Sequence, residues 1–201
     1  QVHEDQIKFK AGVFIAEHTP QSISLEEVAR QADGSLDTFA LVQDAPFTFP
    51  GGCHAAEVEV DPETGITDIL NYYAVDDYGS VINPTFTKGQ VMGGVAQGIG
   101  QAMGEHSAYD LNTGQLISGS LSDYLVPRAA NLSDFEIHFH GSATRANPLG
   151  VKGAGQAGAI AAPQTIVNAI LDALSPLGIE HINMPLTSEN IWRAIQTVKA
   201  S

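Results

Sequence analysis

The chain has 201 residues, of which 43% are hydrophobic and 16% charged, a composition typical of globular rather than disordered proteins. Its 9 Lys and Arg stand against 23 Asp and Glu, giving a formal net charge of −14. A surface this acidic repels phosphate backbones and anionic lipids, so neither nucleic acid nor membrane is expected as a partner.

The first third of the chain predicts short elements separated by a loop. Residues 8–17 alternate loosely between apolar and polar side chains, which predicts a strand, and residues 22–32 predict a short helix capped by Ser22 or Ser24. The Pro- and Gly-rich stretch 43–52 predicts a loop.

A hairpin and a glycine-rich helix are expected next. Residues 54–77 alternate on both sides of DPETG, which is typical of a turn between antiparallel strands. Residues 83–106 show helical spacing of apolar side chains, and Gly93, Gly94, Gly98 and Gly100 lie inside that repeat. Each glycine costs a helix about 1 kcal/mol relative to alanine, so another backbone or a ligand is expected to approach closely there.

The remainder predicts one strand and two helices. A turn is expected at 111–116 and a strand at 134–140, followed by a helix over 163–174 with Pro163 near its first turn. The last helix is expected over 188–198, capped by Thr187 or Ser188. Strands and helices interleave irregularly, which favours an α+β fold with mixed sheet layers packed against helices. No apolar run approaches the roughly 20 residues that span a bilayer.

Gly153, Gly155 and Gly158 have the G-x-G-x-x-G spacing of a dinucleotide-binding turn. That fingerprint requires a strand immediately before it, and the preceding residues 142–152 contain Pro148 and do not read as an apolar strand. What the glycines do indicate is a helix N-terminus with exposed backbone N–H groups, a favourable place for an anion or a polar ligand. Close backbone packing is the alternative explanation.

Other candidate sites are weaker. His138 and His140 share one strand face but lack a third metal ligand, and Asp76 and Asp77 are adjacent in a strand and so point to opposite faces. Cys53 adjoins His54, yet a nucleophile pair requires spatial rather than sequential adjacency. Because Cys53 is the only cysteine, no internal disulfide and no iron–sulfur cluster can form within this chain. A reducing, cytoplasmic location is expected.

Four long segments, in order, resemble one known family. They are VDDYGSVINPTFTKGQVMGGVAQGIGQA, GSLSDYLVPRAANLSDFEIHF, NPLGVKGAGQAGAIAAPQTIVNAILDAL and HINMPLTSENIWRAI. They resemble the C-terminal part of the molybdopterin-binding large subunit of the xanthine oxidase, aldehyde oxidase and aerobic carbon monoxide dehydrogenase family. The resemblance covers residues 50–196, and several long motifs in the right order are more specific than one short pattern.

The resemblance implies a cofactor and partners. The family binds molybdenum through molybdopterin, often in its cytosine dinucleotide form, and hydroxylates aldehydes, N-heterocycles or, in one branch, oxidises carbon monoxide. Electrons leave through 2Fe-2S clusters and FAD on partner subunits. The resemblance also implies that residues 1–201 form a C-terminal piece of the cofactor-binding domain, with a strand–helix–loop segment over 1–50 and a core over 51–201. The rest of the large subunit is then a partner too.

The resemblance also implies roles for particular residues. The family's catalytic base is a glutamate in a G-x-G-E run, and the matching position here is Gln156, preceded by Gly153 and Gly155. The family's Q-G-x-G run near the cofactor matches Gln97, Gly98 and Gly100. A carboxamide cannot take up a proton at neutral pH, so Gln156 cannot be a base. Two readings follow: a hydroxylase impaired as it stands, or a non-catalytic structural or assembly module of the same fold.

Overall fold

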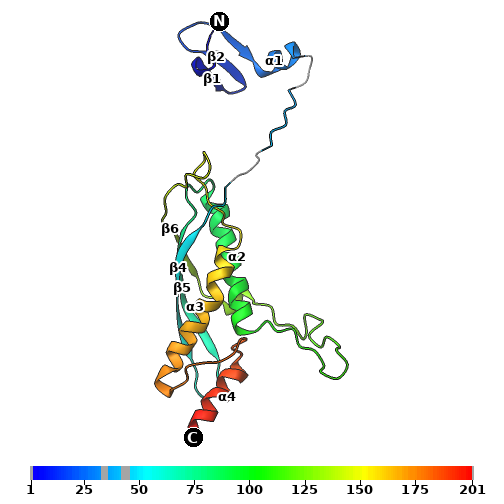
Figure 1. Cartoon of the computed structure of the whole chain (residues 1–201), viewed down its shortest axis with the longest axis vertical. Coiled ribbons are helices and arrows are strands. Elements are labelled where there is room, and N and C mark those ends of the chain that lie inside the picture. The colour runs from blue at the N-terminus through cyan, green and yellow to red at the C-terminus, as the bar shows by residue number, and fades with distance from the viewer. Residues whose placement is uncertain (1, 33–35, 42–45, 201) are drawn as a thin grey trace. The chain divides into compact units, whose positions relative to one another are not determined.

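The computed structural model describes residues 2–32, 36–41 and 46–200, and the chain forms two compact units, Gln1–Asp44 and Ala45–Ser201 (Figure 1). The first unit contains η1 (Glu4–Gln6), an antiparallel sheet of β1 (Ile7–Lys10), β2 (Val13–Ala16) and β3 (Ser22–Ser24), and α1 (Leu25–Gln31). Ser24 caps α1, because its hydroxyl accepts a hydrogen bond from the N–H of Glu27 at 3.1 Å.

Two predictions for this unit were wrong in detail. The single strand expected over 8–17 is a hairpin, because Ala11 and Gly12 adopt positive φ angles of 50° and 79° and reverse the chain. The helix expected over 22–32 begins only at Leu25, since residues 22–24 pair with β2. Part of the loop expected over 43–52 lies outside the described residues, and its last two glycines already belong to the next strand.

The second unit is built on a three-stranded sheet in the order β4-β5-β6. The predicted hairpin is confirmed: β4 (Gly51–Val60) and β5 (Thr67–Asp77) pair antiparallel around the DPETG turn, with a bulge between Glu57 and Val58. Strand β6 (Phe135–Phe139) pairs parallel with β5. The sheet is therefore mixed, and the α+β class expected from the sequence is confirmed.

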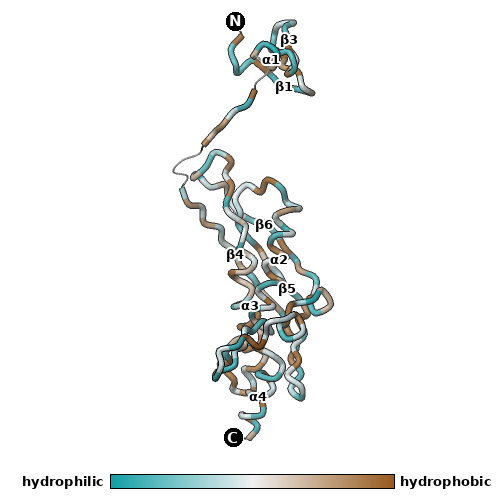
Figure 2. Tube along the Cα trace, turned by 90° about the vertical axis from the view of Figure 1, so that its right-hand side faces the viewer, coloured by the Kyte–Doolittle hydropathy of each residue, from teal (hydrophilic) through white to brown (hydrophobic). Residues whose placement is uncertain are grey.

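Helices α2 (Pro84–Met103) and α3 (Ala157–Leu174) pack against each other and against this sheet (Figure 1). Helix α4 (Ser188–Lys199) contacts the turn between β4 and β5, and two short turns are η2 (Ala129–Asn131) and η3 (Ser175–Leu177). Thr187 caps α4 through a 3.2 Å hydrogen bond from the N–H of Asn190. The most deeply buried side chains come from the sheet, from all three helices and from the segment just before α4: Tyr72, Val91, Val95, Ile166, Ile170, Leu186, Ile191 and Ile195. Figure 2 shows apolar residues along the helices and strands that enclose this core.

Helix α3 begins six residues earlier than expected. Pro163 lies inside the helix rather than at its first turn, and Gln156 is the N-cap residue. The segment Ala157–Leu177 is also long and apolar enough, by length and composition, to cross a membrane, contrary to the expectation that no run approaches that length. In this structure Ile166, Ile170 and Leu174 of the same helix are buried in the core against α2 and the sheet.

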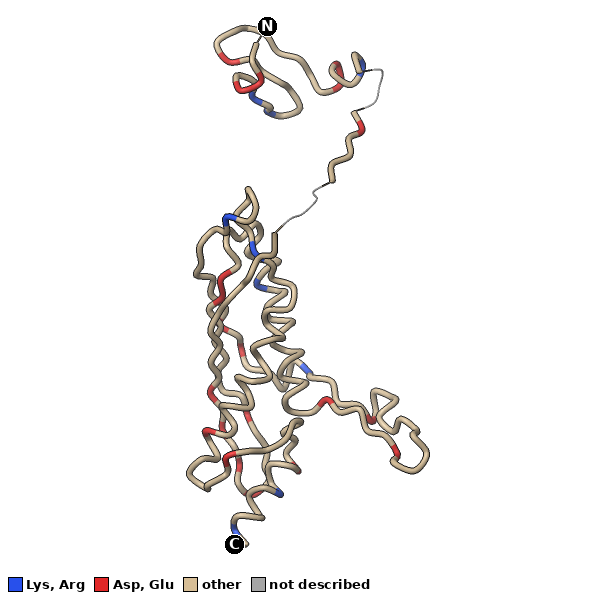
Figure 3. The backbone as a smooth tube through the Cα atoms, viewed as in Figure 1, with Lys and Arg blue, Asp and Glu red and all other residues tan. Residues whose placement is uncertain are grey.

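Acidic residues outnumber basic ones along the chain. Figure 3 shows Asp and Glu along the strands and turns, with Lys and Arg sparse among them. Lys152 is the least exposed of the lysines that form ion pairs in the described residues, and its ammonium group lies 2.5 Å from the carboxylate of Asp77. This ion pair joins the end of β5 to the segment that leads into α3.

Candidate functional site

Gln156 stands at the start of α3, with its side chain exposed. Its backbone has φ −119° and ψ 4°, and its side chain makes no capping hydrogen bond to the helix. The first N–H groups of a helix have no acceptor within the helix, and the helix dipole adds partial positive charge there. The side-chain amide of Gln156 therefore lies at the end of the helix where the first backbone N–H groups are, without capping them.

The segment leading to Gln156 is held by specific hydrogen bonds. The side-chain amide of Asn147 bonds both the carbonyl and the N–H of Val151, at 2.9 and 3.1 Å. The N–H of Lys152 donates to the carbonyl of Tyr78 at 2.9 Å. The ammonium of Lys152 donates to Asp77, and that hydrogen bond, with a second from the N–H of Gly79, holds the pKa of the Asp77 carboxyl below its ordinary value.

Helix α2 meets this segment along one face. The side chain of Gln90 donates to the carbonyl of Gly155 at 2.5 Å. Gln97 follows Gln90 by seven residues, so both lie on one face of the helix, and both are exposed. The structure thus brings Gln90 to the loop that carries Gln156, with Gln97 two turns further along the same face of α2. Sequence reasoning did not single out Gln90, although its spacing from Gln97 is the signal that would have found it.

Glycines of this region divide into two kinds. A Cβ atom added at Gly93 of α2, or at Gly153 or Gly155 of the loop, would have no atom within 4 Å. A Cβ at Gly98 would lie 2.6 Å from the Cβ of Ala162 and 2.8 Å from the Cδ of Pro163. The first group leaves open space in front of the backbone, whereas Gly98 permits the close approach of two helices.

The glycine-rich helix therefore has a packing explanation as well as a proposed ligand. Gly94 faces the backbone of Gly158 and Ala159 in α3, and the position of a Cβ at Gly100 falls 2.4 Å from both Glu105 and Pro127. Contact with a cofactor is expected to account for Gly98 and Gly100. Close protein packing already explains both glycines, because protein atoms occupy the positions where their side chains would lie. Contact of either residue with a cofactor stays a prediction.

The positions of residues along the strands show which of the weaker candidate residues lie close together. Cys53 is exposed whereas the neighbouring His54 side chain is only 2% exposed, so they point to opposite faces. Asp76 and Asp77 likewise diverge, the first into the interior and the second toward Lys152. His138 is exposed and faces Glu136 at 3.9 Å. Among the described residues no group of three or more His, Cys, Asp or Glu is placed to hold a metal ion.

The dinucleotide fingerprint is not supported by its surroundings. Before Gly153 the described chain has only an isolated bridge between Gly79 and Val151 in place of the required strand. The third glycine, Gly158, packs within the helix pair, since a Cβ there would lie 2.4 Å from the carbonyl oxygen of Val91. The lack of a side chain at Gly158 therefore allows α2 and α3 to pack closely.

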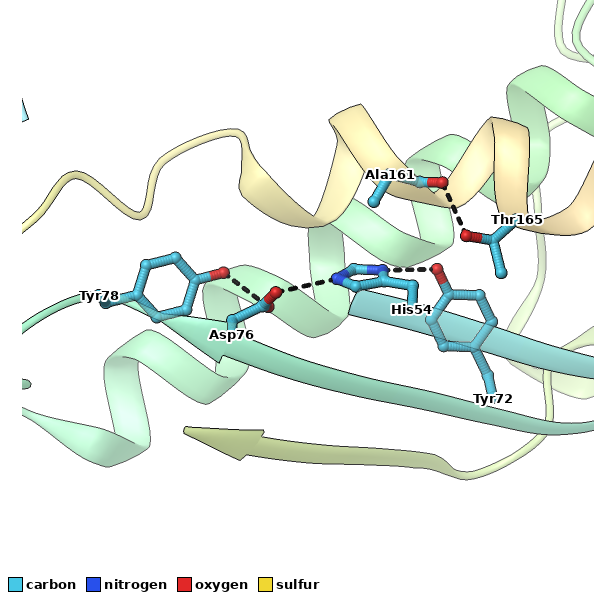
Figure 4. Close-up of polar contacts among 6 residues, drawn as sticks. All are labelled: His54, Tyr72, Asp76, Tyr78, Ala161 and Thr165. Atoms are coloured by element: carbon cyan, nitrogen blue, oxygen red, sulfur yellow. Dashed lines mark hydrogen bonds and ion pairs between the residues drawn. The ribbon is translucent and has the colours of Figure 1, made fainter. Parts of the chain in front are cut away.

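A buried polar network, which the sequence patterns do not predict, lies beneath α3 (Figure 4). His54 contacts the hydroxyl of Tyr72 through Nδ1 at 2.8 Å and the carboxylate of Asp76 through Nε2 at 3.1 Å. The hydroxyl of Tyr78 donates to the second carboxylate oxygen of Asp76 at 2.8 Å. Burial raises the pKa of Tyr72 to about 12 and, with the adjacent Asp76, raises the pKa of Tyr78 as well. We call these four residues the buried network.

The donor set at the loop suits a polar, anionic organic group. The amide side chain of Gln156, the backbone N–H groups at the N-terminus of α3 and the open space at Gly153 and Gly155 offer hydrogen-bond donors and room for such a group. Among the described residues, no cluster of three or more metal-ligating side chains lies at this loop.

Comparison with known proteins identifies the family of this chain. The model of the molybdopterin cofactor-binding domain family matches residues 1–133. The nicotine 6-hydroxylase large subunit of Paenarthrobacter nicotinovorans is 42% identical over 150 residues, covering 75% of this chain and 18% of that protein. The carbon monoxide dehydrogenase large chain of Hydrogenophaga pseudoflava is 33% identical over 150 residues, covering 75% and 19%.

A solved structure extends the likeness over nearly the whole chain. Quinoline 2-oxidoreductase from Pseudomonas putida 86 matches with a TM-score of 0.84 and 34% identity, over 96% of this chain and 26% of that one. The chain thus spans between 18% and 26% of the length of these relatives. It belongs to the molybdopterin-binding large-subunit family of xanthine oxidase-type molybdenum hydroxylases, and its fold is that of the family's cofactor-binding domain.

Proposed function

We propose that this chain forms part of the molybdenum-cofactor site of a hydroxylase that oxidises aldehydes, N-heterocycles or carbon monoxide. The observation that carries the proposal is the position of Gln156 at the N-terminus of α3, in a loop that Gln90 of α2 holds by a hydrogen bond to Gly155. Relatives named for nicotine hydroxylation, quinoline oxidation and carbon monoxide oxidation support this reaction class.

In this proposal the chain's residues bind and orient the cofactor. Gln97 and the N–H groups at the start of α3 donate hydrogen bonds to its pterin and phosphate oxygens, and Gly153 and Gly155 allow the backbone to approach it. Gly98 and Gly100 bring α2 into place. When bound, the cofactor supplies a redox-active molybdenum centre. The cytosine dinucleotide form is favoured, and partner subunits supply 2Fe-2S clusters and FAD.

Residue 156 decides whether the site can move a proton. A glutamate there would accept a proton at its carboxylate during turnover, a contribution worth about 10²–10⁴ in rate. Gln156 is nearly the same shape and can donate or accept hydrogen bonds, but its amide cannot take up a proton at neutral pH. We therefore propose that the site binds the cofactor but turns over slowly.

A non-catalytic structural or assembly role is the second candidate, and Gln156 is the observation that favours it. Both candidates share the fold and the cofactor-facing surface. They differ in whether a glutamate at position 156 would restore turnover.

The test uses the chain within its complete cytoplasmic complex, with the rest of the large subunit and its partner subunits. Dye reduction with aldehydes, N-heterocycles and carbon monoxide is compared between the native complex and Gln156→Glu. The proposal predicts that Gln156→Glu raises turnover by about 10²-fold or more at equal molybdenum content. Equal, negligible turnover in both would favour the non-catalytic role, and full turnover in the native complex would show that residue 156 is not the base.

Gln164→Glu is the matched control. Gln164 is exposed on the same helix, two turns further from the loop, so the substitution adds the same charge without placing a carboxylate at the site. We expect Gln164→Glu to leave dye reduction at the native level. A rise in turnover equal to that of Gln156→Glu would attribute the effect to net charge instead.

A further inference from the structure

The buried network follows from the register of β4 and β5. His54 lies opposite Ala74, and Tyr72 and Asp76 are the two residues that flank Ala74 on the same strand face. The imidazole of His54 therefore reaches one diagonal neighbour with each ring nitrogen. In the Nε2–H tautomer His54 donates to the carboxylate of Asp76, and its Nδ1 accepts from the hydroxyl of Tyr72.

The strand partner of Asp76 is adapted to the carboxylate. Gly52 pairs with Asp76, and a Cβ atom at Gly52 would lie 2.0 Å from the Asp76 carboxylate oxygen and 2.9 Å from a backbone carbonyl. Any larger residue at position 52 would displace this carboxylate. Asp76 is 3% exposed, and its two oxygens accept from the hydroxyl of Tyr78 and the ring of His54.

Tyr78 connects this network to the loop that carries residue 156. Its hydroxyl donates to Asp76, while its carbonyl accepts from the N–H of Lys152. The next residues continue the contact, since Gly79 bridges Val151 and the N–H of Ser80 donates to the carbonyl of Gly150 at 2.9 Å. The chain from Gly150 to Lys152 is thus fixed to residues 78–80, four residues ahead of Gln156.

We propose that Asp76 and Tyr78 are positioning residues, which fix the 150–156 segment and thereby the place of residue 156 beside the cofactor. His54 and Gly52 act through Asp76: the first by a hydrogen bond, the second by leaving room. Neither Asp76 nor Tyr78 is a catalytic residue, because both are enclosed beneath α3. The consequence for the cofactor rests on the proposed function, whereas the ordering of the segment does not.

Hydrogen exchange of the full chain tests the ordering directly. In Tyr78→Phe and Asp76→Asn we expect the amides of Ser80 and Lys152 to exchange about tenfold faster or more, because the buried anchor of Tyr78 is lost. Amides of α4, which is remote from the network, should keep their native rates. Unchanged exchange at Ser80 and Lys152 in Tyr78→Phe would overturn the proposal.

Tyr72→Phe is the matched control, because it removes an equally buried hydroxyl from the opposite end of the network. We expect it to destabilise the core while changing exchange at Lys152 much less than Tyr78→Phe does. Equal acceleration by both variants would mean that the network is only a general element of stability. If Asp76→Asn fails to fold, the comparison between Tyr78→Phe and Tyr72→Phe still decides the question.

The second readout uses the complete complex carrying Gln156→Glu. Adding Tyr78→Phe should lower kcat about tenfold or more while molybdenum content stays constant, because a misplaced base loses rate without loss of the cofactor. An unchanged kcat, with Lys152 exchange accelerated, would overturn the positioning claim. Absence of molybdenum from every variant would instead refute the proposed function and leave the exchange result to be judged alone.

Discussion

The packing of α2 against α3 leads to a prediction that two neighbouring glycines can test. An alanine at Gly94 would place its Cβ 2.8 Å from the backbone nitrogen of Ala159 and 3.1 Å from the Cα of Gly158. Both are backbone atoms, so no rotamer change can relieve the contact and the helices must separate by several tenths of an ångström. At Gly93, one residue earlier in the same helix, an added Cβ meets nothing within 4 Å.

The two substitutions share the same gain in helix propensity, about 1 kcal/mol, so their difference isolates the cost of overpacking. That cost is about 1–3 kcal/mol. Gly93→Ala should raise the free energy of unfolding. The free energy of unfolding of Gly94→Ala should be lower than that of Gly93→Ala by the cost of overpacking. Denaturant unfolding of the chain, followed by circular dichroism, measures both. Equal stability of the two variants would refute the close-packing explanation of these glycines.

Two further substitutions test the core and the anchor of the loop. Ile166→Ala should cost about 2–5 kcal/mol because Ile166 is fully buried, whereas Ile160→Ala, exposed on the same helix, should change stability by less than about 0.5 kcal/mol in the same unfolding assay. The Asp77 carboxyl accepts from Lys152 and Gly79, so its folded pKa lies below the ordinary 3.8, and its contribution is present above that value and is lost as the pH falls through the folded pKa. The destabilisation caused by Asp77→Asn should therefore be full at neutral pH and vanish in acid, and a pH-independent difference in unfolding free energy would contradict this assignment.

Much of the second unit could be predicted from local patterns. Alternation on both sides of DPETG gave the hairpin, and the spacing of Val91, Val95 and Ile99 gave α2. The start of α3 was misplaced because residues 157–162 contain only Gly, Ala and one Ile, which show no apolar stripe. That run is helical because its small residues allow contact with Gly94 and Gly98, a tertiary effect.

The roles of the candidate site residues stay predictions. Glycines and the Gln97 and Gln156 positions were identified from the resemblance, but Gln90 was not, because its role depends on which face of α2 meets the loop. The sequence does not predict the buried network for a similar reason. His54 and Asp76 are distant in sequence, and only the exact pairing of β4 with β5 shows that they share a face.

Molybdenum content of the complete complex tests the central claim most directly. Metal is measured by elemental analysis in the native complex and in a variant with Gly153 and Gly155 both replaced by valine, which fills the open space before the loop. The account predicts stoichiometric molybdenum in the native complex and a strong loss in the double variant. Native complex without molybdenum, or full molybdenum in the double variant, would contradict the claim that this loop faces the cofactor.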